Sequence, residues 1–200
     1  MSALGAPLPA SFYARDCVAV AQDLVGRYLV RDEVVLRIAE TEAYCGPDDT
    51  AAHTRMGRTA RNAPMWGPPG RAYVYLCYGL HVMLNVVAGS PLGSAVLIRA
   101  AEPVAGLDAI RARRGGKDGP VLLTGPGKVG AALALDVSMS HHPLTEAGGL
   151  WIAAGEPPER LRSGPRVGID YAQAADRAAP WRFALPRSPW VSAPKGLELR

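Results

Sequence analysis

The stretch AYVYLCYGLHVMLNVV, residues 72–87, decides which class of fold the chain can adopt. Its apolar and aromatic side chains suit a pleated, half-buried surface, and Gly79 interrupts them near the middle. This pattern predicts a β-hairpin with its turn near Gly79. Two strands joined by so short a turn run antiparallel, so the chain should contain an antiparallel sheet.

Alternation along the hairpin predicts where its side chains point, because residues two apart on a strand share a face. Tyr78 has the opposite parity to the tyrosines before it and lies beside Gly79, so it should project from the tip. The side chains that should share a face are Tyr73, Tyr75 and Cys77 on the first strand, and His81 and Asn85 on the second.

The segments around the hairpin extend the sheet and add a few helices. Strand-like runs lie at 27–30, 34–43, 94–101, 150–154 and 181–185. Helical patterns lie at 14–25, 104–114 and 127–135. Since strands and helices do not alternate in a βαβ rhythm, we predict an α+β protein with a mainly antiparallel sheet.

Length and composition indicate one globular domain. The 200 residues fit a single compact domain, with residues 1–11 as a flexible N-terminal tail. The contents of 48% apolar and 20% charged residues are typical of globular proteins. The cysteines, Cys17, Cys45 and Cys77, are odd in number and widely spaced, which favours neither a disulfide framework nor a zinc ribbon.

The chain shows no targeting or membrane-spanning pattern. The N-terminal sequence MSALGAPLPA lacks the basic and apolar regions of a signal peptide. The longest apolar run, Tyr73 to Gly89, is interrupted by His81 and Asn85 and does not fit a membrane span. Together with the unpaired cysteines, these features predict a cytoplasmic protein that does not associate with a membrane.

The charge balance weakly favours an anionic partner. Twenty-two basic and 18 acidic residues give a net charge of +4. Only Lys117, Lys128 and Lys195 are lysines, so most of the cations are arginines. The planar fork of arginine suits the geometry of phosphate.

Residues 37–53, RIAETEAYCGPDDTAAH, place two carboxylates at the end of an apolar strand. Glu40, Glu42 and Tyr44 share a face if the strand stays regular. Burying a carboxylate is costly unless it is paired or hydrogen-bonded. The residues alone leave two explanations, structural ion pairs with arginines or a site of chemistry, and we favour an ion pair for Glu40.

The segment 46–70 has no clear strand or helix pattern, and so long a loop inside a compact domain is usually functional or disordered. It contains His53 and the arginines Arg55, Arg58 and Arg61. Aromatic side chains and arginines together are what stacking on a base and binding phosphates require. The alternatives are a solvated or capping role for His53 and structural roles for the tyrosines.

Two other motifs predict less. The sequence GPGK at 125–128 is not a phosphate-binding loop of the P-loop type, because Leu122 and Val129 occupy its glycine and Ser/Thr positions. Backbone N–H groups beside Lys128 can still hold one phosphate, and a helix cap explains the glycines equally well. The aspartates and histidines lack metal-ligand spacing, so we expect neither a metal nor another cofactor.

Several long motifs in order resemble the alkyladenine (3-methyladenine) DNA glycosylase family, single-domain type: AETEAYCGPDDTAAHTR, YVYLCYGLHVMLNVV, VLIRAAEP, LLTGPGK, and RVGIDYA followed by PWRFALPRSPWVS. The resemblance extends from about Phe12 to Ser192. It implies a curved antiparallel sheet flanked by helices, with a protruding hairpin. It also implies a monomer that acts on double-stranded DNA containing damaged purines, near the nucleoid in a bacterium.

The resemblance further implies roles for the candidate residues. Glu42 would activate the attacking water, and Arg99 would hold that water and the carboxylate. The base pocket would be lined by Tyr44, His53 and Tyr75, with Asn85 at its wall. DNA would be contacted by Tyr78 as a wedge in the duplex and by Lys128, Arg55, Arg58 and Arg61.

The residues leave three rival functions open: a non-catalytic module for flipped bases, a hydrolase of free nucleosides or nucleotides, and a metal-dependent hydrolase. A bifunctional glycosylase would need an amine nucleophile, and Lys128 precedes a helix instead of facing the Glu42 strand. We therefore predict a monofunctional enzyme that leaves an abasic site. The resemblance implies that it excises 3-methyladenine, 7-methylguanine, hypoxanthine or ethenoadenine without a metal.

Overall fold

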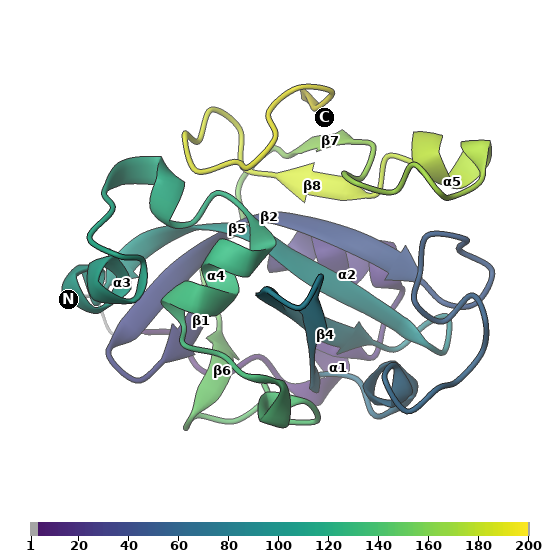
Figure 1. The fold of residues 1–200 in the computed structure, drawn as a ribbon, viewed down its shortest axis with the longest axis horizontal. Coiled ribbons are helices and arrows are strands. Elements are labelled where there is room, and N and C mark those ends of the chain that lie inside the picture. The colour runs from purple at the N-terminus through teal and green to yellow at the C-terminus, as the bar shows by residue number, and fades with distance from the viewer. Residues whose placement is uncertain (1–3, 200) are drawn as a thin grey trace.

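Two long strands, β2 (Val34–Cys45) and β5 (Ser94–Ala105), form the centre of the sheet in the computed structural model, which describes residues 4–199 (Figure 1). On one side of this pair lie β4 (His81–Ala88) and then β3 (Ala72–Cys77). On the other side lie β8 (Arg182–Ala184), β7 (Arg162–Gly164) and β9 (Glu198–Leu199). The strand β1 (Tyr28–Arg31) also pairs with β2, and β6 (Leu150–Ala153) pairs with β1.

The pairings among these strands are antiparallel, so the predicted α+β class with a mainly antiparallel sheet is confirmed. The hairpin of β3 and β4 forms one edge, with Cys77 opposite His81 next to its turn. Within residues 4–199, no helix reaches the length and apolarity that a membrane crossing requires.

Helices cover both faces of the sheet. The α-helices are α1 (Ala10–Tyr13), α2 (Cys17–Leu24), α3 (Leu107–Arg113), α4 (Pro126–Ala132) and α5 (Ala174–Ala178). Short 3-10 helices lie at Ala63–Trp66, Gly119–Leu122 and Val137–Met139. In Figure 1, α4 lies in front of the sheet beside β4, and α2 lies behind it.

Close packing brings α4 next to the hairpin. Gly130 lies so near β4 that a Cβ atom there would stand 2.0 Å from the carbonyl oxygen of Val82. A side chain at position 130 would therefore force the helix away from the strand. Val129 is fully buried in the main core, so the same turn of α4 supplies both the close approach and an apolar anchor.

Two predicted segments differ from the structure. The helix expected at 104–114 begins only at Leu107, because β5 continues to Ala105 in register with Val35 and Gly106 turns the chain with a φ of 74°. The segment 1–11, expected as a flexible tail, makes contacts with the fold in the part described. Leu8 is buried and donates its backbone N–H to Ile152 at 2.9 Å, while residues 1–3 lie outside the described range.

Candidate active site

A row of side chains crosses four neighbouring strands on one face of the sheet. Glu42 of β2 pairs in register with Leu97 of β5, Leu97 with Asn85 of β4, and Asn85 with Tyr73 of β3. Residues directly opposite in an antiparallel pair point to the same side of the sheet. The register therefore brings the predicted base and the predicted pocket-wall residue onto one surface.

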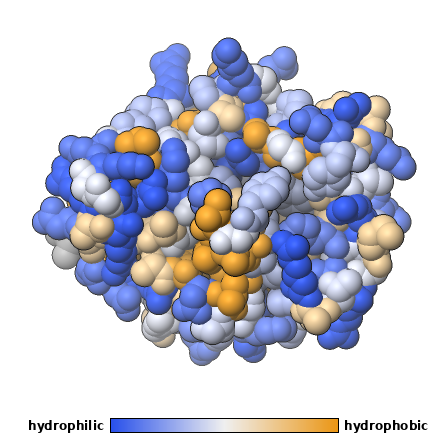
Figure 2. All heavy atoms as spheres, in the orientation of Figure 1, coloured by the Kyte–Doolittle hydropathy of each residue, from blue (hydrophilic) through white to orange (hydrophobic). Residues whose placement is uncertain are grey.

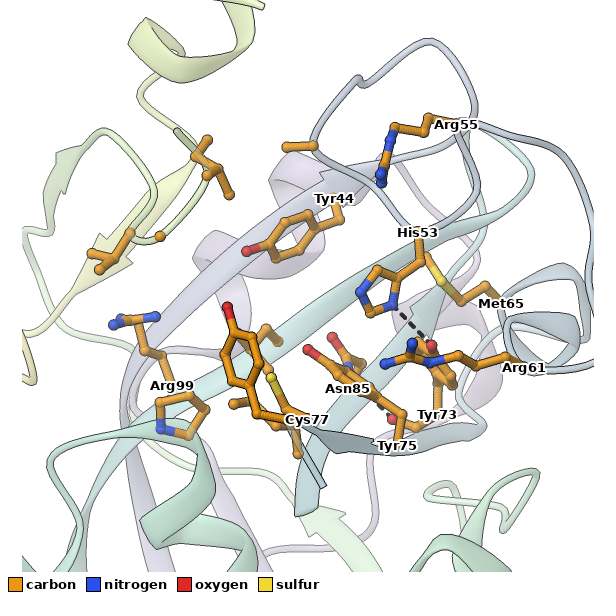
Figure 3. Close-up of a pocket in the computed structure, with 18 of the residues that line it drawn as sticks. Tyr44, His53, Arg55, Arg61, Met65, Tyr73, Tyr75, Cys77, Asn85 and Arg99 are labelled. Atoms are coloured by element: carbon orange, nitrogen blue, oxygen red, sulfur yellow. Dashed lines mark hydrogen bonds between the residues drawn. The ribbon is translucent and has the colours of Figure 1, made fainter. Parts of the chain in front are cut away.

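A cavity of about 720 Å³ lies over this row (Figure 3). Its volume is within the range of pockets that enclose small ligands. The predicted site residues that line it are Tyr44, His53, Arg55, Arg61, Tyr75, Tyr78, Asn85 and Arg99. Segments far apart in the sequence thus converge on one space.

Glu42 lies directly behind the cavity wall, with its side chain fully buried. Its Oε1 accepts a hydrogen bond from the backbone N–H of Val167 at 2.8 Å, and its Oε2 accepts one from the Tyr44 hydroxyl at 3.0 Å. Nη1 of Arg99 lies 3.4 Å from Oε1. These three groups belong to residues that line the cavity, so the carboxylate is one side chain away from whatever the cavity holds.

Burial raises the pKa of Glu42, and the neighbouring charge of Glu40 acts in the same direction. Arg99 and the hydrogen bonds from Val167 and Tyr44 oppose the effect without cancelling it. A carboxylate with a raised pKa is a stronger base than an ordinary one while it remains ionised. The environment of Glu42 therefore suits it to accept a proton.

Arg99 is shared between two carboxylates. The pairing of β2 with β5 shifts register on both sides of Glu40, and the Arg99 guanidinium lies 3.5 Å from Glu40 through Nε and 3.4 Å from Glu42 through Nη1. Glu40 is also 3.0 Å from Nη1 of Arg182 and accepts the backbone N–H of Ser192 at 2.7 Å. The ion pair expected for Glu40 is thereby confirmed, and it fixes one side of the Arg99 fork.

One wall of the cavity is aromatic. The rings of Tyr73 and Tyr75 stack with their centroids 5.3 Å apart, and His53 meets Tyr75 edge-on at 4.7 Å. Nδ1 of His53 is 2.9 Å from the Tyr73 hydroxyl (dashed in Figure 3). Burial and the cations Arg61 and Arg55 lower the pKa of His53 to about 4, so its ring is neutral near pH 7.

Tyr44 stands apart from this wall in Figure 3, toward Arg99. Asn85 lies in the floor between them, with Nδ2 donating to the carbonyl oxygen of Tyr73 at 3.2 Å. Flat aromatic surfaces with a few polar groups between them suit a planar, hydrogen-bonding ligand.

The predicted DNA-contacting cations fall into two groups. Arg61 lies over the ring of Tyr75, 5.5 Å from its centroid, and Arg55 lies 5.1 Å from that of Tyr171, so both border the cavity. Arg58 is exposed and Lys128 partly exposed, and neither belongs to the lining. Nζ of Lys128 donates to the Thr124 hydroxyl at 3.3 Å. Pro126, which belongs to the same GPGK motif, does line the cavity.

Tyr78 projects from the tip of the hairpin, and its side chain is 90% exposed. The turn is closed by a hydrogen bond of 3.0 Å from the N–H of Leu80 to the carbonyl of Cys77. Both central residues, Tyr78 and Gly79, have positive φ, 50° and 68°. Figure 2 shows apolar surface over the hairpin at the centre of this face, with hydrophilic surface on both sides; Leu76 and Leu80 are exposed there.

The sequence did not assign roles to several lining residues. Val167, Ile169 and Tyr171 come from the segment 165–172, which follows β7 and contributes to the cavity lining. The segment belongs to the motif RVGIDYA, which carried the resemblance without a residue-specific role. Tyr73 was placed on the correct face but was given no task in the pocket.

Chemically, the site offers a buried carboxylate beside a cavity with an aromatic wall. Within residues 4–199 there is no cluster of three or more His, Cys, Asp or Glu side chains able to hold a metal ion. The reactive groups on hand include the Glu42 carboxylate, the Arg99 guanidinium, the His53 imidazole, the Cys77 thiol, and the hydroxyls and amide of the lining.

Comparisons with known proteins match nearly the whole chain to one family. The family described as "Methylpurine-DNA glycosylase (MPG)" matches residues 11–189. A protein of Nitrosococcus oceani named "Putative 3-methyladenine DNA glycosylase" is 60% identical over 194 residues, which cover 96% of each chain. A protein of Arabidopsis thaliana named "DNA-3-methyladenine glycosylase" is 54% identical over 191 residues, which cover 94% of this chain and 75% of its own.

Proposed function

This chain belongs to the methylpurine-DNA glycosylase family, as its motifs predicted, and we propose that it is a monofunctional enzyme of base excision repair. It rotates a damaged purine out of duplex DNA and hydrolyses the N-glycosidic bond, which leaves an abasic site. The observation that carries this proposal is the position of Glu42, behind a cavity that is lined by all three groups contacting its carboxylate.

The lining of the cavity suits a purine base. Tyr44 and the wall of Tyr75 and His53 present aromatic surfaces, and the neutral ring of His53 adds no repulsion toward a cationic base. Purines alkylated on a ring nitrogen, such as 3-methyladenine and 7-methylguanine, carry positive charge, which aromatic faces attract. Neutral lesions such as hypoxanthine and ethenoadenine stack on the same surfaces. Asn85 lies in the floor of the cavity, where an extra amino group on the base would meet it.

The donors around Glu42 leave one hydrogen-bond acceptor site of its carboxylate for a water molecule. A carboxylate offers about four lone-pair sites, and Val167, Tyr44 and Arg99 are directed at three of them. The fourth accepts a hydrogen bond from the attacking water. Glu42 takes the water's proton as the new C1′–O bond forms, and the electron pair of the breaking C1′–N bond leaves with the base. The ionised carboxylate also stabilises the cationic sugar of the transition state.

The rest of the surface supports DNA as the substrate. Tyr78, at the exposed tip, fills the gap that the extruded nucleotide leaves. Arg61 lies beside β3, where its Nη2 donates to the carbonyl oxygen of Leu76 at 3.3 Å, and Lys128 lies on α4, which packs against β4. Arg55 and Arg58 belong to the same loop as Arg61. Cations on both sides of a wedge match the two directions in which the phosphate backbone continues. A monomer is sufficient for this arrangement.

A gel assay tests the proposal. Duplex DNA with a single hypoxanthine, and in parallel methylated genomic DNA, is incubated with the protein in the presence of EDTA. We expect release of the free base and strand cleavage only after alkali treatment. Binding of the lesion without release would instead favour a non-catalytic module, and loss of activity with EDTA would favour a metal-dependent hydrolase.

A further inference from the structure

Arg166 occupies an unusual place for a cation, because its side chain is fully buried. Its guanidinium forms a two-pronged ion pair with Asp49, with Nη1–Oδ2 at 2.5 Å and Nη2–Oδ1 at 2.9 Å. Nη1 also donates to the carbonyl oxygen of Ala43 at 2.9 Å. The rings of Tyr44 and Trp181 lie near it, with their centroids 4.9 Å and 5.0 Å from Cζ.

Asp49 extends this arrangement into the turn that follows β2. Its Oδ2 accepts the backbone N–H of Cys45 and its Oδ1 that of Ala51, both at 3.0 Å. Ala51 lines the cavity. One ion pair therefore ties the end of the Glu42 strand, the turn after it and the segment 165–172 to one another.

Arg166 is adjacent to two of the groups that donate hydrogen bonds to Glu42, the Val167 N–H and the Tyr44 hydroxyl. Val167, whose N–H donates to Oε1 at 2.8 Å, is the next residue in the chain after Arg166. Tyr44, whose hydroxyl donates to Oε2 at 3.0 Å, presents its ring to the guanidinium. A displacement of Arg166 would thus move both donors relative to the carboxylate.

We propose that Arg166 is a positioning residue for hydrolysis, which acts through Val167 and Tyr44 to hold the Glu42 carboxylate at the angle that accepts the water. The inference rests on the proposed function, because this task exists only if Glu42 is the base. A merely structural ion pair would contribute to stability alone. A positioning role requires that the rate of base release and its pH dependence also change.

The direction of the pH effect follows from the groups that face Glu42. These are Glu40 and Tyr44 from β2, Arg99 from β5, and the Val167 N–H from the segment 165–172, with Arg182 of β8 paired to Glu40. The hydrogen bonds from Val167 and Tyr44 lower the pKa of Glu42 against the effect of burial. Weakening them raises that pKa further. The acid limb of the pH–rate profile should therefore move to higher pH when Arg166 is altered.

The test uses two variants of the full chain. Arg166→Lys keeps the charge and loses the fork, and the double variant Asp49→Asn with Arg166→Gln replaces the ion pair by two amides. The double variant removes both buried charges together, so neither is left unpaired. Single-turnover release of hypoxanthine from duplex DNA is measured across pH, together with lesion-DNA affinity and the melting temperature.

We expect the single-turnover rate constant to fall between about tenfold and a hundredfold, the loss typical of a small misplacement of catalytic groups. Lesion-DNA affinity should change much less, and the acid limb should move to higher pH. Ile110→Ala serves as a control, because Ile110 is buried on α3 and lies outside the cavity lining. It should lower the melting temperature and leave the rate and the acid limb unchanged.

A folded Arg166 variant that keeps the wild-type rate and acid limb would overturn the proposal. A fall in rate with no movement of the acid limb would also overturn it, because Glu42 would then have kept its environment. If the wild-type protein itself releases no base, the proposed function fails and Arg166 is not the cause. The two failures are therefore distinguished by the wild-type measurement.

Discussion

Replacing Glu42 by Gln changes the charge of the proposed base while preserving its shape. The amide oxygen can still accept the N–H of Val167, which donated to the carboxylate at 2.8 Å. The amide nitrogen then faces the Tyr44 hydroxyl, which can rotate to accept, while Nη1 of Arg99, 3.4 Å from Oε1, can still donate to the amide oxygen. Arg99 retains its contact with Glu40 at 3.5 Å. The pocket should therefore keep its form while losing its proton acceptor.

General-base catalysis contributes about 10²- to 10⁴-fold to a rate. Glu42→Gln should therefore slow base release by at least a hundredfold, which is about 2.7 kcal/mol in the activation barrier. The effect on the free energy of unfolding should be small, because two changes oppose each other. The neutral amide removes the cost of burying a charge, and it also loses the electrostatic attraction of Arg99. We expect a change of less than about 1 kcal/mol, or about 2–4 °C in the melting temperature for a chain of this size.

The assay is single-turnover release of hypoxanthine from duplex DNA, with enzyme in excess, from pH 5 to pH 9. Wild-type activity should disappear as the pH falls through the raised pKa of Glu42, and the residual activity of Glu42→Gln should lack that limb. Lesion-DNA affinity should remain close to that of the wild type. Glu102→Gln is the matched control, because Glu102 lies on β5, pairs with Arg37 and lies outside the cavity. A Glu42→Gln protein that keeps more than a tenth of the wild-type rate would refute the assignment of the base.

Three further outcomes are expected. Tyr78→Ala should weaken lesion binding and excision by at least tenfold. The melting temperature should stay within about 1 °C, because the side chain is 90% exposed. Equal excision by the wild type and Tyr78→Ala would contradict the wedge role. His53 has a pKa of about 4 when folded and about 6.5 when unfolded. The unfolded state therefore binds more protons between these values, so urea-unfolding stability should fall from pH 7 to pH 5, and less so in His53→Asn. Arg58→Ala should reduce the slope of log affinity against log salt by about 0.9 if Arg58 contacts one phosphate, and an unchanged slope would exclude that contact.

Local patterns in the sequence predicted the elements that carry the site. The helix expected at 14–25 forms at Cys17–Leu24, where the Asp16 carboxylate caps it by accepting the N–H of Ala19 at 2.9 Å. The hairpin forms where it was expected, and alternation placed Tyr75 and Asn85 on the face that borders the cavity. Both results depend on periodicity, which is a property of neighbouring residues.

Local sequence patterns could not predict contacts between residues far apart in the chain. Val167 donates to Glu42 across 125 positions of the chain, and Arg166 pairs with Asp49 across 117. The short strands β7 and β9, of three and two residues, carry no readable alternation. Register between strands, which aligned Glu42 with Leu97 and Asn85, is likewise set by packing of the whole sheet. The pocket residues in the prediction came from resemblance to a family, and their grouping around one cavity came from the structure.

At Tyr78, in the turn at the hairpin tip, the residue that would best stabilise the fold differs from the residue proposed to act in repair. Two successive residues with positive φ form the kind of turn in which Asn-Gly is the favoured pair, yet here Tyr78 precedes Gly79. A bulky residue in that conformation carries backbone strain of order 1 kcal/mol. Selection for heat resistance alone would therefore replace Tyr78 by Asn, and the result would be a more stable protein without its proposed wedge. Laboratory evolution of this chain should accordingly be run with a repair-dependent screen, since a screen for thermal survival would reward the loss of the activity.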